Sequence, residues 1–237
     1  MRRKIEKTYG KTVKGVMHVI NPLKKKIIKT FCTVHKYINI KAVEILKIND
    51  HIDEYEFYKN NIRTLNEGVM WADQDFKSTN HFYHVVKGRG LFGFSDALTE
   101  CKRYYDKSIL FLKQKNLKKS IFYLGAACHL IQDATVPQHV NNKLLKEHRK
   151  FEVWITSKLM NDYSFEEEKK IKRYDTIDEY IKNNAVLAYN CYKKYVNIKE
   201  KEERYEKISN TIIREAEKTT AGFLVDYYAE YKTIFPI

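Results

Sequence analysis

Residues 129–152 contain five side chains of the kinds that bind metal ions, at spacings that a helix can use. His129 and Asp133 stand four positions apart, and so do His148 and Glu152. On a helix, each pair therefore projects from one face, about one turn apart, and can hold a single ion. Imidazole and carboxylate ligands together suit zinc, and a carboxylate can also bridge two ions.

A break in the helical pattern lies between the two pairs, at Val136 and Pro137. Proline cannot donate a hydrogen bond to the preceding turn, and it biases the residue before it away from the helical region. We therefore expect a turn at this point, which can direct His139 toward the second pair.

The segment around His129 is mostly apolar all round, which indicates a helix buried in a core. One His-x3-Asp pair alone is more often a surface pair or a capped core histidine than a pair of ligands. Two such pairs and a further histidine close together indicate a metal cluster, because an unpaired buried charge is costly. The apolar residues are Ile121, Phe122, Leu124, Ala127, Cys128 and Ile131.

The elements that would position these side chains are helices. Only eight glycines and three prolines punctuate the 237 residues, which favours long helices over many short strands. The polar region 68–93 is expected to be a loop that carries Asp73 and His81. Thr176 and Asp178 are expected to cap the sixth helix. The helices are expected near residues 35–49, 52–67, 94–115, 117–134, 142–161, 176–196 and 200–231.

Length and composition predict an all-α protein with a single globular helical domain. A chain of 237 residues with 43% hydrophobic residues can bury one sizeable core and is short for two domains. Residues 1–31 are rich in Lys and Arg and are expected to form a basic N-terminal arm. No run of about 18 apolar residues occurs, so no transmembrane segment is expected.

Charge and cysteine usage give expectations about partners and compartment. The formal net charge of +14 would attract an anionic membrane surface or nucleic acid, and it does not discriminate between them. The four cysteines show no paired spacing, which favours reduced thiols in a cytoplasmic chain. Residues 1–31 lack the continuous apolar stretch of a secretory signal, which also favours the cytoplasm.

Several segments of the chain resemble the zinc-dependent bacterial phospholipases C, the family of the Bacillus phosphatidylcholine-hydrolysing enzyme and the catalytic domain of clostridial alpha-toxin. The family's signature resembles FYLGAACHLIQDATVPQH followed by HRKFE. Its first helix resembles HKYINIKAVEIL, which begins at His35, and its aspartate loop resembles GVMWADQD, which ends at Asp75. Its His-aromatic-aromatic motif resembles HFY at His81. The resemblance covers about residues 33–160 and implies a multi-zinc cleft in a phospholipase C-like domain over residues 32–237.

The resemblance also implies two or three zinc ions and their ligands. The ligands of the first ion would be Asp73, His81, His129 and Asp133. The ligands of the second would be His139, His148 and Glu152. Part of the third site would be formed by His35 and a bridging Asp133. Asp73 resembles the family's general base, with the role of a ligand only as the alternative. The remaining histidines are interpreted as surface or supporting residues, with His84 near enough to His81 to replace it as a ligand; they are His18, His51 and His84.

The chain departs from the family at the third zinc site. In the family, an N-terminal tryptophan exposed by signal-peptide cleavage completes this site, but neither Trp71 nor Trp154 lies near the start of this chain. Either the third site is absent or another group fills it. Cys32 is a candidate, because thiolate is a strong zinc ligand and Cys-x2-His is a usable spacing. The alternative is a buried free cysteine beside the start of a helix.

The resemblance predicts a zinc-dependent phosphodiester hydrolase of the phospholipase C type, which cleaves phospholipid to diacylglycerol and a phosphorylated head group. Gln74 and Ser78 stand where choline-preferring members have cage aromatics, so a choline preference is not expected. One alternative is a single-strand nuclease or nucleotidase on the same scaffold, a branch in which Asp usually replaces Glu152. Another is a zinc-binding member without catalysis. The family also makes secretion the alternative to a cytoplasmic location.

Overall fold

Every regular element in the described part of the chain is a helix, as the low glycine and proline content predicts. The computed structural model describes residues 32–74, 79–90, 95–141, 145–161, 163–166 and 169–236. The helices are α2 (Thr33–Ile48), α3 (Ile52–Ala72), α4 (Ala97–Lys113), α5 (Leu117–Asp133), α6 (Pro137–Val140), α7 (Leu145–Met160), α8 (Ile177–Tyr195) and α9 (Lys201–Ile234). The fold class is all-α. The expected basic arm, residues 1–31, lies outside the described residues.

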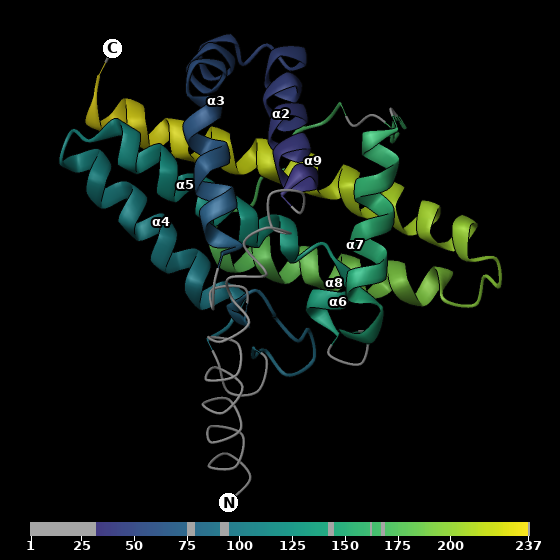
Figure 1. The fold of residues 1–237 in the computed structure, drawn as a ribbon. Coiled ribbons are helices and arrows are strands. Elements are labelled where there is room, and N and C mark those ends of the chain that lie inside the picture. Colours follow the sequence, from purple (N-terminus) through teal and green to yellow (C-terminus); the bar gives the residue numbers. More distant parts are fainter. Residues whose placement is uncertain are drawn as a thin grey trace, which may run out of the picture.

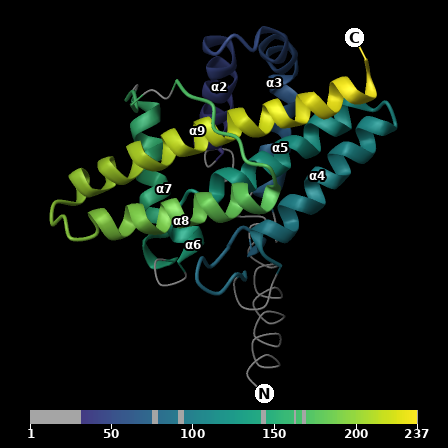
Figure 2. The same cartoon turned by 180° about the vertical axis from the view of Figure 1, so that it is seen from behind.

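Helix α5 is packed between α3 and α4, and α9 runs across the molecule beside α2 (Figure 1). The view from behind shows α8 and α9 side by side, joined at one end by a short connection (Figure 2). In this arrangement the first turn of α2, the C-terminal ends of α3 and α5, the short α6 and the first half of α7 all contribute to one site.

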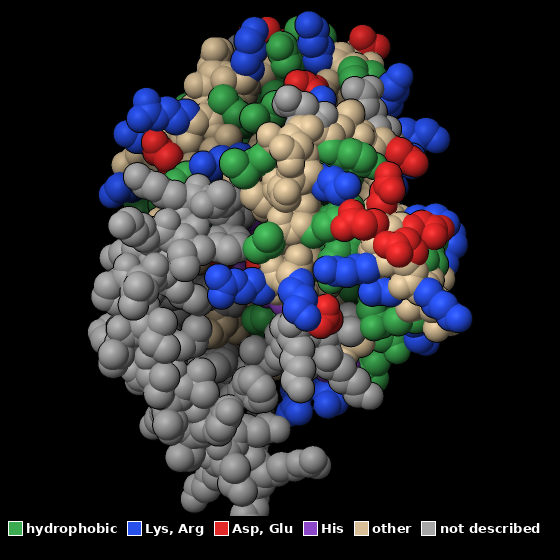
Figure 3. Space-filling view, turned by 45° about the vertical axis from the view of Figure 1, so that its right-hand side comes forward, with side chains coloured by type: hydrophobic (Ala, Val, Ile, Leu, Met, Phe, Trp, Pro, Cys, Tyr) green, Lys and Arg blue, Asp and Glu red, His purple; other side chains and the backbone are tan. Residues whose placement is uncertain are grey.

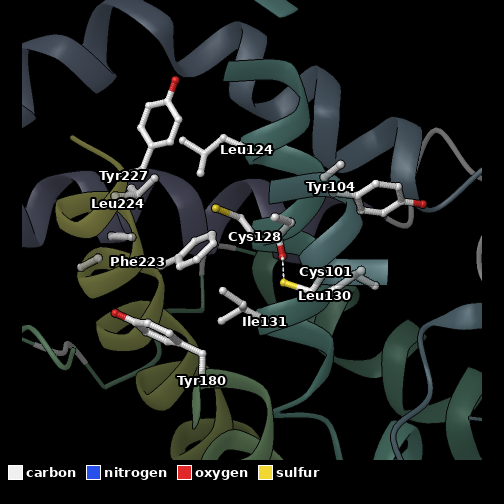
Figure 4. Packing of buried hydrophobic residues seen from close by; sticks show 14 of the residues in the cluster. Cys101, Tyr104, Leu124, Cys128, Leu130, Ile131, Tyr180, Phe223, Leu224 and Tyr227 are labelled. Atoms are coloured by element: carbon white, nitrogen blue, oxygen red, sulfur yellow. Dashed lines mark hydrogen bonds between the residues drawn. The ribbon is translucent and has the colours of Figure 1, made fainter. Parts of the chain in front are cut away.

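The core around α5 combines small and aromatic side chains. Cys101, Cys128 and Ile131 pack against Phe223 and Tyr180 in the interior (Figure 4). Several buried tyrosines have hydrogen-bond partners for their hydroxyl groups, because an unpaired buried hydroxyl is costly. Tyr58 donates to the carbonyl of Leu224 at 2.7 Å, for example. All four cysteines are free, as their spacing predicts.

Local signals account for several helix boundaries. Thr176 accepts from the backbone N–H of Glu179, and the Glu179 carboxylate accepts from the N–H of Thr176, which is a complete capping box. The expectation that Thr176 begins this helix is confirmed. Asp178 lies in the first turn and pairs with Lys102 and Lys182 instead of capping the helix.

The expectation of a loop over residues 68–93 is wrong at its start. Helix α3 continues through Gly68 to Ala72. Val69 and Ala72 are fully buried, so packing against α5 keeps this segment helical although Gly68 is a weak helix former. Asp73 therefore lies at the C-cap of α3 and not within a loop, which gives its carboxylate a rigid support.

Candidate metal centre

All eight ligand candidates predicted from the sequence come together in the structure. Their donor atoms form three groups in which all atoms lie within 4.8 Å of one another. The groups are His35, His129 and Asp133; Asp73, His81 and His129; and His139, His148 and Glu152. Residues from six separate elements or connections thus form one cluster.

Asp133 lies at the centre of the cluster and is almost fully buried. Its Oδ1 faces Nε2 of His35 at 3.4 Å. Its Oδ2 faces Nδ1 of His81 at 2.9 Å and Nε2 of His129 at 3.1 Å. The two oxygens of the Asp133 carboxylate therefore face different imidazoles, as the oxygens of a ligand that bridges two ions must.

The group on α6 and α7 lies next to this centre. Nε2 of His148 lies 2.7 Å from Nε2 of His139 and 3.0 Å from Oε1 of Glu152. Helix α6 begins with Pro137 directly after Val136, whose backbone is extended, so the predicted break directs His139 toward α7. Nδ1 of His139 lies 3.7 Å from Oδ2 of Asp133, which links the two parts of the cluster.

Carbonyl oxygens orient two of the imidazoles. Nε2 of His81 lies 3.1 Å from the carbonyl oxygen of Ala72, and Nδ1 of His139 lies 3.3 Å from that of His81. A carbonyl can only accept, so these nitrogens carry the proton of the neutral ring. The lone pairs are then on Nδ1 of His81 and Nε2 of His139, the nitrogens that face the cluster. Such an arrangement is typical of histidine ligands.

The donor set fits a divalent cation. With its Nε2–H committed to Ala72, neutral His81 presents a lone pair to Oδ2 of Asp133 at 2.9 Å. Two lone pairs at this distance repel each other unless a proton or a metal ion lies between them. The groups combine imidazole and carboxylate donors, which is the ligand chemistry of catalytic zinc sites.

The electrostatics of the buried groups agree with this fit. Burial lowers the pKa of His35 and of His129, and it lowers the pKa of His139 to about 4. Burial acts in the opposite direction on Asp133, but the surrounding imidazoles hold the pKa of this carboxyl well below its usual range. Burial opposes protonation of His81 and of His148 as well, but the carboxylates of Asp133 and Glu152 raise the pKa of these two rings, so a cation there would displace a proton. Neutral imidazoles around an ionised carboxylate are the protonation states that bind metal.

Asp73 and Cys32 lie together at the edge of the cluster. The Cys32 thiol is buried and donates to Oδ2 of Asp73 at 3.6 Å. Burial raises the pKa of the thiol well above its ordinary value and also raises the pKa of Asp73. Cys32 belongs to none of the three ligand groups among the described residues. The thiol thus contacts a ligand candidate rather than His35, its partner in the Cys-x2-His spacing.

The other sequence candidates lie away from the cluster or outside the described residues. His51 is the N-cap of α3, with Nδ1 3.3 Å from Glu54. Nδ1 of His84 accepts from the backbone N–H of Val86 within its own turn, so the imidazole belongs to none of the ligand groups found in the described part. His18 and Ser78 lie outside the described residues.

The sequence analysis assigned no role to Gln132, whose side chain contacts a ligand candidate. Its Oε1 lies 2.8 Å from Nδ1 of His35, and Gln132 is almost fully buried. The available signal was its position: a polar amide directly before Asp133, in the mostly apolar second half of a helix.

Comparisons with known proteins support this geometry. The family model described as zinc dependent phospholipase C matches residues 34–205. No curated protein matches the chain. Among solved structures, the alpha toxin from Clostridium absonum is similar at 17% identity with a TM-score of 0.68, and the match covers 85% of this chain and 64% of the toxin.

The alpha-toxin from Clostridium perfringens, isolated from an avian strain, is similar at 18% identity with a TM-score of 0.65. The match covers 85% of this chain and 63% of that toxin. At these identities the likeness is one of fold. The matched part of each toxin is less than two thirds of its length.

Proposed function

The chain belongs to the zinc-dependent phospholipase C family, and from this premise we propose that it hydrolyses phospholipids to diacylglycerol and a phosphorylated head group. The observation that carries the proposal is the convergence of eight imidazole and carboxylate ligands in three adjoining groups. In His81 and His139, one ring nitrogen donates to a backbone carbonyl oxygen, and the lone pair of the other nitrogen faces the cluster. A metal site requires such lone pairs, whereas a cluster of buried ion pairs does not.

The proposal assigns the residues to metal sites as follows. One zinc ion would be held by His139, His148 and Glu152. A second would be held by Asp73, His81, His129 and Asp133. A third would be held in part by His35 and Asp133. When bound, zinc polarises the phosphoryl oxygens and lowers the pKa of water toward neutrality.

Asp73 is proposed as the general base, in addition to its place in the ligand set. Its position at the C-cap of α3 keeps the carboxylate at the edge of the cluster, where the residue is half-buried. Burial raises its pKa, which makes the carboxylate a stronger base. It would take a proton from the attacking water as the new bond to phosphorus forms. The bond from phosphorus to the glycerol oxygen breaks, that oxygen takes a proton from solvent water and leaves as the alcohol, and Asp73 returns its proton to solvent.

The head group is proposed not to be choline in particular. Gln74 directly follows Asp73, at a position where a cage aromatic would attract a quaternary ammonium by about 0.5–2 kcal/mol. An amide offers no such attraction, so phosphatidylcholine should have no advantage over ethanolamine, serine or glycerol head groups.

Anionic bilayers are proposed as the preferred surface because of the net charge of +14. Lys and Arg side chains are spread over the described part of the face shown in Figure 3, with acidic side chains between them. Among the described residues no helix is long and apolar enough to cross a membrane. We favour the secreted alternative over the cytoplasmic one, because the two similar structures described above are toxins.

A substrate panel tests the proposed function. Vesicles of phosphatidylcholine, phosphatidylethanolamine, phosphatidylserine and phosphatidylglycerol, together with single-stranded DNA, are assayed with and without a chelator. We expect chelator-sensitive release of phosphorylated head groups, highest on anionic vesicles and falling as salt screens the attraction. Asp133→Ala should abolish turnover and lose most of the zinc, because it removes the shared ligand.

The control variant is Asp178→Ala, which removes a half-buried carboxylate that pairs with Lys102 and Lys182. It should keep wild-type zinc content and activity. Cleavage of DNA alone would support the nuclease alternative, and no turnover by zinc-loaded protein would support the non-catalytic one. A strong preference for phosphatidylcholine would contradict the role given to Gln74.

A further inference from the structure

A buried chain of side-chain amides leads from the interior to His35. Nδ2 of Asn39 donates to Oδ1 of Asn66 at 2.9 Å. Nε2 of Gln132 donates to Oδ1 of Asn39 at 2.8 Å and to Oγ1 of Thr220 at 3.2 Å. Oε1 of Gln132 is then left for Nδ1 of His35, at 2.8 Å. The chain joins α2, α3, α5 and α9.

The position of Gln132 calls for an explanation, because a buried amide needs hydrogen-bond partners that an apolar side chain would not need. Asn39 and Thr220 are fully buried and Gln132 is almost so. Each needs a hydrogen-bond partner there, and the three satisfy one another. An apolar residue at position 132 would fill the same space without this requirement. Only a residue with an acceptor, such as this amide, can also accept a hydrogen bond from the imidazole of His35.

The acceptor decides which nitrogen of His35 faces the cluster. Both donor positions of the Gln132 amide are occupied, so its oxygen accepts the Nδ1–H of His35. The neutral ring then has its lone pair on Nε2, which faces Oδ1 of Asp133 at 3.4 Å. His81 and His139 obtain the same orientation from backbone carbonyl oxygens.

We propose that Gln132 is a positioning residue for His35, which it holds in the tautomer that presents Nε2 to a cation shared with Asp133. The inference rests on the proposed metal centre. A partner that holds the far nitrogen of a histidine ligand typically contributes about 10–100-fold to metal affinity. Removal of the Gln132 acceptor should therefore weaken the zinc ion at His35 by about that factor and leave the other ions unchanged.

The tautomer of His35 is a direct test, measured on metal-free protein by NMR with nitrogen-labelled histidine. The expected spectrum shows His35 protonated at Nδ1, and in Gln132→Leu the Nδ1–H form loses its preference. A wild-type ring protonated at Nε2 would overturn the proposal, because the amide chain would then run in the opposite direction. This measurement does not depend on zinc, so it separates a failure of this inference from a failure of the proposed function.

Zinc affinity provides the second test, by competition with a chromogenic chelator. Gln132→Leu should weaken one zinc ion by about 10–100-fold, whereas Gln132→Glu keeps an acceptor for Nδ1–H and should restore most of that affinity. Full affinity for every zinc ion in folded Gln132→Leu, or no restoration by Gln132→Glu, would overturn the proposal.

Asn184→Leu is the matched control for the loss of a buried amide. Asn184 is fully buried and donates to the carbonyl of Ile131 at 3.0 Å and to Thr219 at 3.1 Å, and neither of these two acceptors belongs to a ligand candidate. Asn184→Leu should destabilise the fold to about the same degree as Gln132→Leu, while its zinc affinity stays at the wild-type value. An equal loss of zinc affinity in Asn184→Leu would mean that Gln132 acts through general stability, and would overturn the positioning role.

Discussion

Asp133 shows how much of the site depends on one carboxylate. His35 faces one of its oxygens, and His81 and His129 face the other. Its position four residues after His129 places both side chains on the same face at the end of α5. A substitution here therefore affects every group around it, whereas a loss of Glu152 would affect only the group on α6 and α7.

At the same scale, we predict what the contact between Cys32 and Asp73 does. The buried thiol donates to the carboxylate, so we expect a supporting hydrogen bond rather than a zinc ligand. Cys32→Ser keeps a donor and should keep the zinc content unchanged. Cys32→Ala removes it and should lower activity about two- to tenfold, since a net hydrogen bond is worth about 0.5–1.5 kcal/mol.

Elemental analysis and the absorption of cobalt-substituted protein check this prediction. A thiolate ligand would give an intense near-ultraviolet charge-transfer band and would cost one metal ion when replaced by serine. Either result would contradict the hydrogen-bonding role and support Cys32 as the ligand of the third site. Cys191→Ser is the control, because Cys191 is buried in a separate hydrophobic cluster.

At the scale of elements, the contact between α3 and α5 sets the position of two ligand-bearing helix ends. A Cβ atom on Gly125 would lie 2.0 Å from the carbonyl oxygen of Leu65, and one on Gly68 would lie 1.8 Å from that of Phe122. Only glycine permits this close approach, because the obstructing atoms are backbone atoms that cannot rotate away.

Gly125→Ala should accordingly destabilise the protein by about 1–3 kcal/mol, the usual cost of overpacking. Alanine is the better helix former by about 0.5–1 kcal/mol, and the steric term outweighs this gain. Denaturant unfolding measures the difference. Lys118→Ala, at an exposed position of the same helix, is the control and should change stability by less than about 0.5 kcal/mol. An unchanged or higher stability of Gly125→Ala would contradict the close contact.

At the scale of the whole molecule, the proposed zinc ions act as cross-links between elements that are distant in the sequence. The three ligand groups draw on α2, α3, α5, α6 and α7 and on the connection that carries His81. Lone pairs of buried imidazoles and carboxylates that face one another repel unless a proton or a cation lies between them. Metal binding should therefore be coupled to global stability.

Removal of zinc should lower the melting temperature. A ligand that binds only the folded state at about 1,000 times its Kd stabilises it by about 4 kcal/mol. For a chain of this size each kcal/mol corresponds to about 2–4 °C, so we expect a decrease of about 8–16 °C. Differential scanning calorimetry with and without a chelator measures it, and zinc added back in excess should restore the melting temperature. An unchanged value after complete zinc removal would contradict the coupling.

The sequence by itself determined the features that depend on residues close together in the chain. Spacings of four placed two ligand pairs on helix faces, Pro137 predicted the break that aims His139, and Thr176 marked the start of α8. Such signals can be read without the fold, because helix periodicity and capping are local properties. The resemblance to a family of zinc enzymes came from the same short segments.

Only the tertiary structure decided which atoms meet. His35 and Gln132 are 97 residues apart, and nothing in the sequence pairs an asparagine, a glutamine and a histidine into one hydrogen-bonded chain. The extension of α3 to Ala72 also depends on burial against α5, which overrides the weak helix preference of Gly68. Ligand types are a local property of the chain, whereas tautomer, bridging and support of each ligand depend on contacts between distant elements.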